Sequence, residues 1–316
     1  MSWLPLGLDF DGGIPQQRRL VEQLRHVAEL RAHERDLRLW ASRAQAAKVR
    51  RAIEQLRAAH PGPWLTFYGS GDFNHVSLLL LETLPRDAQP VTLVLIDHHP
   101  DWFTLPPRYH CGNWVAGALR LPWVESAVLI GQGSADLRGH SFWVVPFREL
   151  CEGDVQVFPS TTARVRVPLR WPAAVRGAAG STRRWYGTEL RFPTVEQQGA
   201  AAVFDAVAAR LAGQQVYVCL DKDCLAAPYA ATDWDQGRLT LQEVLSGIER
   251  LQQTTKLVGM DVCGDAAPSP LRGVLKRLDA GRLFSRPARH ADWLRINQET
   301  NLAILRSVTT DVVASR

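Results

Sequence analysis

The stretch that decides the fold is residues 91–101, which read Val-Thr-Leu-Val-Leu-Ile-Asp-His-His-Pro-Asp. Its first six residues are almost wholly apolar and predict a strand that is buried on both faces. A polar turn follows at once, and a carboxylate at the end of a buried strand is costly unless a cation meets it. Asp97, His99 and Asp101 present two carboxylates and an imidazole from this turn. These are ligands that suit a divalent metal ion.

The same arrangement, an apolar strand that stops at a polar cluster, recurs along the chain. Residues 64–68 precede Gly69–His75, residues 216–220 precede Asp221–Asp223, and residues 256–260 precede Asp261–Asp265. Helix-length segments, at 195–211 and 240–251, separate the later strands. This alternation indicates a parallel sheet that is covered by helices on both faces. Because ligands bind at the carboxyl ends of the strands in such sheets, we expect the polar clusters to converge.

The converging clusters predict a site for two metal ions. In an extended backbone, side chains two residues apart point the same way, so Asp221 and Asp223 face one side together. A single Asp at a strand end is more often a helix N-cap, and a single His is more often an ordinary loop residue. Joint occurrence at successive strand ends favours two divalent ions, about 3.5–4 Å apart. The expected ligands are His75, Asp97, His99, Asp101, Asp221 and Asp223.

The chain has 316 residues, of which 46% are hydrophobic and 22% are charged, so it is able to bury a full core. We find no long polar linker and expect one domain over residues 1–316. Residues 16–60 are rich in Arg, Glu and Ala, and their apolar residues keep a helical spacing. We therefore expect an N-terminal helical segment there, made of two helices with a break near His33–Asp36.

Charge and cysteine content restrict the class of protein. The 37 Lys and Arg outnumber the 32 Asp and Glu by only five, and the Arg residues are not clustered, so we expect no nucleic-acid partner. No apolar run is close in length to the roughly 18 residues that a membrane-spanning helix needs. The start of the chain has no basic region before its apolar residues, unlike a secretory signal. Five cysteines without a CxxC pair fit neither a disulfide framework nor a zinc knuckle, so a cytoplasmic location is expected.

Three of the polar clusters resemble, in chain order, the metal-binding signatures of the arginase/agmatinase (ureohydrolase) family. Residues 69–75 resemble its Gly-Gly-Asp-His motif, residues 97–101 its Asp-Ala-His-x-Asp motif, and residues 219–223 its Ser-x-Asp-x-Asp motif. Residues 259–262 resemble its last strand motif, so the resemblance covers about 64–265. It implies a three-layer αβα fold with a central, mostly parallel sheet.

The resemblance also implies a dinuclear manganese centre with a bridging hydroxide. One ion would be held by His75, Asp97, Asp101 and Asp221, and the other by Asp97, His99, Asp221 and Asp223. In this reading Asp97 and Asp221 bridge the two ions. The physics of the site agrees, because two cations lower the pKa of a shared water toward neutrality.

The chain departs from the family pattern in three places. Two extra residues, Phe73-Asn74, precede His75. Val115 stands where arginases have a proton-shuttling His, and Gly264 stands where they have a Glu that grips the guanidinium group. His110 and Asp265 lie near these two positions and are the expected substitutes. The expected catalytic and substrate-binding residues are Asp101, His110, Asn113 and Asp265.

These observations predict a hydrolase that cleaves a C–N bond of a guanidino or amidino compound, with two divalent ions, expected to be Mn²⁺. Two alternatives stay open: an amide hydrolase of the deacetylase-like branch of the same broad fold, and a metal-binding protein that has lost catalysis. The expected partner is a small-molecule substrate, with no membrane partner, and the resemblance favours a homo-oligomer. The sequence leaves open the substrate, the metal, the oligomeric state and the group that replaces the proton shuttle missing at Val115.

Overall fold

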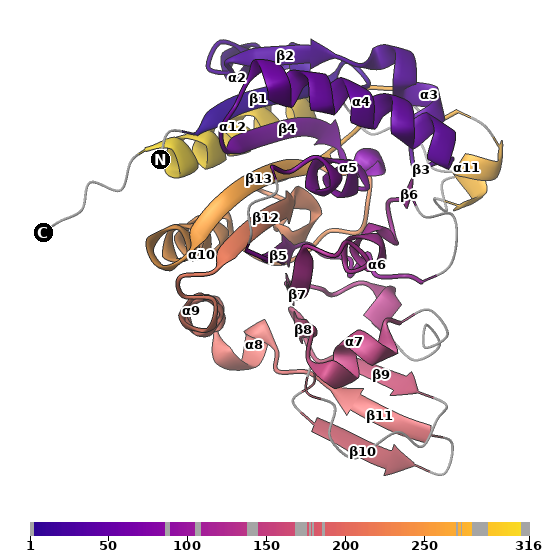
Figure 1. Cartoon of the computed structure of the whole chain (residues 1–316), viewed down its shortest axis with the longest axis vertical. Helices are drawn as coiled ribbons and strands as arrows, with labels where there is room; N and C mark the ends of the chain where they lie inside the picture. Colours follow the sequence, from indigo (N-terminus) through magenta and orange to yellow (C-terminus); the bar gives the residue numbers. More distant parts are fainter. Residues whose placement is uncertain are drawn as a thin grey trace, which may run out of the picture.

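An eight-stranded sheet runs through the computed structural model of the chain (Figure 1). The structure describes residues 3–310, apart from 86–88, 105–108, 138–144, 168–175, 177, 179, 185–186, 270, 273 and 280–289. In sheet order the strands are β2 (His26–Glu29), β1 (Leu4–Asp9), β4 (Trp64–Ser70), β13 (Lys256–Asp265), β12 (Gln215–Asp221), β5 (Val91–Ile96), β7 (Val124–Ile130) and β8 (Val155–Phe158). Every neighbouring pair in this sheet is parallel. The predicted α/β fold class is confirmed.

Helices cover both faces of the sheet, which makes three layers (Figure 1). One face carries α4 (Arg43–Ala59), α5 (Val76–Glu82), α6 (Trp114–Ala118) and α7 (Phe147–Glu152), and the other carries α9 (Ala200–Arg210), α10 (Leu241–Thr254) and α12 (His290–Thr309). Each face encloses its own apolar cluster. Strands β4, β5 and β12 are buried along their whole length, as the unbroken apolar run of β5 predicts.

Two helices of the layers, α4 and α10, begin at sequence signals that satisfy free backbone groups. α4 starts after Ser42, whose side chain accepts from the Gln45 N–H while the Gln45 side chain accepts from the Ser42 N–H. α10 starts after Thr240, which exchanges the same pair of bonds with Glu243. Such capping boxes mark where a helix begins and satisfy N–H groups that have no partner within the helix.

The prediction for residues 16–60 is wrong in part. The α-helix α1 (Gly13–Gln16) ends where the segment begins. The segment itself contains three α-helices, α2 (Arg18–Val21), α3 (Glu34–Leu37) and α4, but it also contains β2, which extends the sheet beside β1. Only Ala28 of β2 is buried, so the strand has no strong apolar pattern. It forms because β1 offers an open edge to which its backbone pairs, a tertiary effect that local spacing does not reveal.

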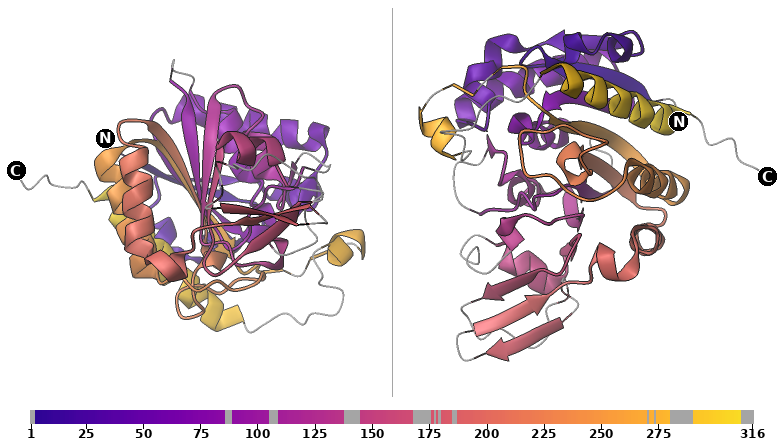
Figure 2. Two further views of the ribbon diagram at one scale, coloured as in Figure 1. Left: turned by 90° about the horizontal axis from the view of Figure 1, so that it is seen from below. Right: turned by 180° about the vertical axis from the view of Figure 1, so that it is seen from behind.

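A second, smaller sheet was also not predicted. Strands β9 (Arg164–Val167), β11 (Gly187–Arg191) and β10 (Gly180–Arg184) pair in antiparallel fashion and project from one end of the molecule (Figure 2). A short strand pair, β3 (Trp40–Ala41) with β6 (Tyr109–His110), ties the N-terminal region to the loop before α6. No helix among the described residues is long and apolar enough to cross a bilayer.

The strand order brings the polar clusters together. Strands β4, β13, β12 and β5 are consecutive neighbours, and all four end at the same edge of the sheet. In the register between β12 and β5, Leu220 lies beside Ile96, so Asp221 and Asp97 follow at adjacent positions. The sheet therefore brings the ends of the four strands, and the polar clusters that follow them, to one edge.

Candidate metal centre

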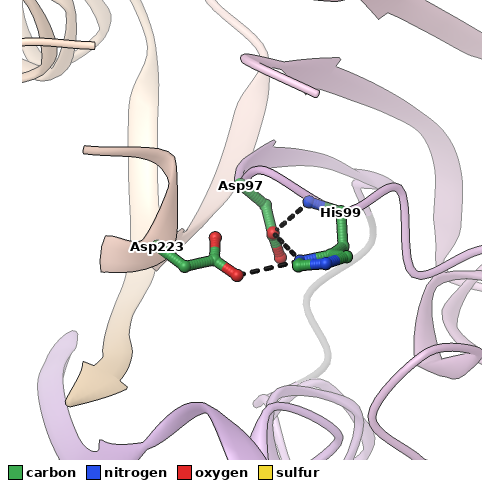
Figure 3. Close-up of side chains that lie close together, drawn as sticks. All are labelled: Asp97, His99 and Asp223. Carbon is green, nitrogen blue, oxygen red and sulfur yellow. Dashed lines mark hydrogen bonds and ion pairs between the residues drawn. The ribbon is translucent and has the colours of Figure 1, made fainter. Parts of the chain in front are cut away.

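Asp97, His99 and Asp223 lie close together at the carboxyl edge of the sheet (Figure 3). One potential ligand atom from each residue lies within 4.8 Å of the others. The His99 Nδ1 atom lies 2.9 Å from Asp223 Oδ2 and 3.8 Å from Asp97 Oδ1. Two carboxylates and one imidazole that face a common point form a donor set for a borderline divalent cation.

Backbone N–H groups hold the carboxylates in place. Asp97 Oδ1 accepts from the His99 N–H at 2.6 Å, and Asp223 Oδ1 accepts from the His98 N–H at 3.0 Å. Asp221 Oδ1 accepts from the Asp223 N–H at 3.0 Å. Each of these three carboxylates thus has one oxygen fixed by the loop, and the other oxygens face inward toward their neighbours. Such outer contacts orient metal ligands before any metal binds.

Asp101 completes the acidic group on the side of α6. Its Oδ2 accepts from Asn74 Nδ2 at 2.7 Å and from the Trp114 indole N–H at 2.8 Å. Asn74 Nδ2 also donates to Asp97 Oδ2 at 3.0 Å. The Asp101 backbone has a φ of 46°, a left-handed conformation that is uncommon outside glycine. Strained backbone of this kind concentrates at functional sites.

The electrostatics of the cluster favour a cation. Burial raises the pKa of Asp97, Asp101 and Asp223 well above the usual range, and the neighbouring carboxylates raise it further. Burial also raises the pKa of Asp221. Among the described residues, no Lys or Arg forms an ion pair with any of these four. A divalent ion would supply the positive charge that the fold does not provide.

The structure does not place the predicted ligand His75 in this cluster. The His75 side chain is buried, and neither ring nitrogen makes a hydrogen bond of normal geometry, although the Leu37 backbone lies nearby. Burial lowers its pKa to about 3, and the charges that act on it are those of His110 and Lys276. The 3₁₀ turn Gly71–Phe73 ends so that Asn74, one residue earlier, points at the aspartates.

A cavity of 410 Å³ opens over the cluster. Asp101, His99, Asp221 and Asp223 form part of its lining, as do the predicted residues His110 and Asn113. His110 Nδ1 accepts from the Gly112 N–H at 2.9 Å, so the neutral ring carries its proton on Nε2. Asn113 Oδ1 accepts from the His110 N–H at 3.1 Å and holds this loop together.

Asp265, predicted as a substrate-binding residue, lies outside the lining of this cavity and has another role. It forms a buried ion pair with Lys222 and accepts from Gln17 Nε2 at 2.7 Å. Lys222 begins the 3₁₀ turn Lys222–Cys224, is fully buried and does not line the cavity, and its ion pair holds Asp265 outside the cavity as well. Gly264 has a φ of 93°, and a Cβ atom there would overlap the Asp221 carboxylate. A Glu at this position would displace a predicted metal ligand.

Asp136, Trp234 and Phe103 also line the cavity and were not predicted. Asp136 lies in a short 3₁₀ turn after β7, and burial raises its pKa. The Trp234 ring meets His99 edge-on and donates to Asp72 Oδ1 at 3.2 Å. The sequence could have indicated Asp136, because β7 is another buried parallel strand and the polar residues that follow it reach the same edge of the sheet.

The comparisons with known proteins point to one family. Residues 183–269 match the sequence model described as the arginase family, and this segment carries Asp221, Asp223 and Gly264. The fold supports the match: an arginase of Bacillus cereus superposes with a TM-score of 0.60 at 14% identity, covering 99% of this chain and 100% of that one. The resemblance to the arginase family is confirmed, in a divergent form.

Other relatives show how far the chain has diverged. The proclavaminate amidino hydrolase of Streptomyces clavuligerus is similar with a TM-score of 0.55 and 16% identity, over 98% of this chain and 92% of that one. An uncharacterised protein of Thermotoga maritima is 22% identical over 219 residues, which are 69% of this chain and 63% of that protein. The aligned part therefore spans less than two thirds of this relative's length. At such identities the solved structures establish the shared fold alone.

Proposed function

We propose that the protein is a metal-dependent hydrolase that cleaves a C–N bond of a guanidino or amidino compound. The observation that carries the proposal is the group Asp97, His99 and Asp223, which has no Lys or Arg partner among the described residues. His99 and Asp223 line the cavity. The arginase-family match adds the class of reaction. We further propose that residues 1–316 act as one catalytic domain.

Two divalent ions, with Mn²⁺ as the first choice, fit the donor chemistry of the site. Asp97, His99, Asp221 and Asp223 would hold one ion, and Asp97, Asp101 and Asp221 would contribute to a second beside it. When bound, such ions lower the pKa of a coordinated water toward neutrality and polarise the group under attack.

The protein's own residues would position the substrate and move protons. Asp101 is held by Asn74 and Trp114, so its carboxylate has a set orientation at the cavity wall and is placed to accept a proton. His110 carries a proton on Nε2 and lines the cavity, where Val115 supplies no proton donor. We propose it as the donor to the leaving amine. Asp136 offers a carboxylate to the cationic substrate, while Phe103 and Trp234 exclude water.

A second function is kept because of two observations. Val115 is fully buried and has no proton to transfer, and the Asp265 carboxylate is paired with Lys222. The chain therefore lacks two groups typical of the family, the one that transfers a proton and the one that binds the guanidinium group. A protein that binds metal and a small molecule without turnover would need neither of them. This reading predicts metal binding without product release.

The test is urea or amine release by protein reconstituted with MnCl₂, over a panel of guanidino and amidino compounds. We expect turnover of at least one compound and its loss in Asp223→Asn. The exposed Asp205 on α9 gives the matched control, because Asp205→Asn removes a carboxylate far from the cavity. Arginine is expected to react poorly, with kcat/KM below about 10⁴ M⁻¹s⁻¹. Stoichiometric metal with no turnover on the whole panel would favour the second function.

A further inference from the structure

Asn74 occupies the point where the two sides of the metal cluster meet. Its amide nitrogen donates to Asp97 Oδ2 at 3.0 Å and to Asp101 Oδ2 at 2.7 Å. The side chain is buried, and these two carboxylates come from opposite ends of the turn that follows β5. Asn74 therefore joins, through one neutral group, two anions that would otherwise repel each other.

Hydrogen-bond donors on the side of the Asn74 amide that faces away from the aspartates fix its orientation. Its Oδ1 atom accepts weak hydrogen bonds from Cys263 Sγ at 3.5 Å, from Cys219 Sγ at 3.9 Å and from the Tyr68 hydroxyl at 3.5 Å. Cys263 Sγ also donates to Asp221 Oδ2 at 3.2 Å, which ties this support to the cluster. The donors behind the amide thus favour an Asn74 with its N–H groups toward the aspartates.

Asn74 presents its amide nitrogen, a hydrogen-bond donor that does not serve as a metal ligand, to both aspartate oxygens. Rotation of the amide by half a turn would place Oδ1, a metal ligand, where Nδ2 now lies. That rotation would turn the NH₂ group toward Tyr68, Cys219 and Cys263, so the bonds that now hold the amide would be lost or reversed.

We propose that the two metal positions differ in affinity and that Asn74, rather than His75, controls the weaker one. The position at Asp97, His99, Asp221 and Asp223 keeps its imidazole and fills first. The position at Asn74, Asp97, Asp101 and Asp221 has a neutral amide as its fourth donor, and it fills only when that amide releases the two carboxylates. This inference rests on the proposed metal-dependent function and specifies how its site is loaded.

Calorimetric titration of chelator-treated protein with MnCl₂ tests the inference, together with elemental analysis after gel filtration. The wild type is expected to retain one ion per chain through gel filtration and to bind a second at least about tenfold more weakly. Asn74→His supplies an imidazole, and Asn74→Asp supplies a carboxylate of the same size. Both should tighten the second affinity by about 10–100-fold, the range typical of changes next to a metal ligand. The first affinity should change much less.

His75→Gln is the matched control, because it alters the neighbouring buried residue and leaves Asn74 in place. It should leave both affinities unchanged. Loss of the second ion in His75→Gln, or unchanged binding in both Asn74 variants, would overturn the inference. If Asn74→His does not fold, Asn74→Asp decides, since it keeps the volume of the side chain. A wild type that binds two ions equally overturns this inference alone, whereas one that binds none overturns the proposed function as well.

Discussion

Asp265 and Asp223 lie near the ends of neighbouring strands, β13 and β12, yet their charges are met in opposite ways. Asp265 is paired with the buried cation of Lys222, and Asp72 and Asp9 are likewise paired with Arg38 and Arg31. Asp223 faces His99 and other carboxylates, without a Lys or Arg partner in the part of the chain that the structure describes. The same edge of the sheet thus holds two kinds of buried acid.

The difference separates stability from binding. A carboxylate with an internal cation is already neutralised, so its pair belongs to the fold and its loss should weaken folding. A group of carboxylates without such a cation is costly in the isolated protein, which the raised pKa values of Asp97, Asp101 and Asp223 express. The unfavourable free energy of burying these carboxylates is offset only when a cation binds from solution. Such a site lowers the stability of the metal-free protein in return for its function. This distinction can be tested variant by variant.

The largest effect is expected from removal of a paired cation. Lys222→Met leaves the Asp265 carboxylate buried without its partner, which typically lowers the free energy of unfolding by about 3–5 kcal/mol. Urea unfolding of the chelator-treated protein measures it without a contribution from metal. The control is Lys222→Met combined with Asp265→Leu, which should recover most of the loss because no charge is left unpaired. A single variant within about 1 kcal/mol of wild type would show that the pair is not structural.

A third kind of acid sharpens the comparison. Asp261 is buried and is met by hydroxyl groups, with donors at 2.7 Å from Tyr217, 3.0 Å from Ser77 and 3.3 Å from Tyr68. Burial raises its pKa from 3.8 to about 6. Between these values the unfolded chain ionises while the folded chain keeps its proton, so the contribution to stability is complete below about pH 4 and is lost as pH rises through about 6.

The size of this effect is up to about 3 kcal/mol, since one pKa unit corresponds to 1.36 kcal/mol. Asp261→Asn cannot ionise, so we expect the difference in unfolding free energy between wild type and variant to fall by that amount from pH 4 to pH 7. Urea unfolding at a series of pH values measures this difference. Other titratable groups contribute equally to wild type and variant, so their effects cancel. A difference that stays constant with pH would mean that Asp261 is ionised in the fold throughout.

The smallest of the three effects concerns the acids that have no internal cation. Asp97 touches both proposed metal positions and Asp223 only one, so Asp97→Ala should weaken Mn²⁺ binding by at least about 100-fold and Asp223→Ala by about tenfold. A tenfold change is 1.4 kcal/mol. Calorimetric titration measures both variants. Neither should lower the stability of the metal-free protein as Lys222→Met does. Equal losses in the two variants would argue against a bridging role for Asp97.

Much of the site could be predicted from the sequence, because the position of its residues depends on the local periodicity of apolar residues. An apolar run such as Val91–Ile96 has few outcomes other than a buried parallel strand, and the polar residues directly after it must lie at the sheet edge. Asp97, His99 and Asp223 come together for that reason. The expected two-residue repeat of an extended chain is not what places Asp223, because β12 ends at Asp221 and the 3₁₀ turn Lys222–Cys224 carries Asp223 to His99.

Only the tertiary structure decided which partner a side chain contacts and in which direction a turn points its residues. A 3₁₀ turn advances the chain by a different angle per residue than a helix or strand does, so whether Asn74 or His75 meets the aspartates depends on where that turn ends. Asp265 could face the cavity or Lys222, and the choice follows from packing between β13, β12 and the N-terminal Gln17. β2 forms because β1 has an open edge. Contacts between distant segments settle such questions, and local sequence patterns carry no record of them.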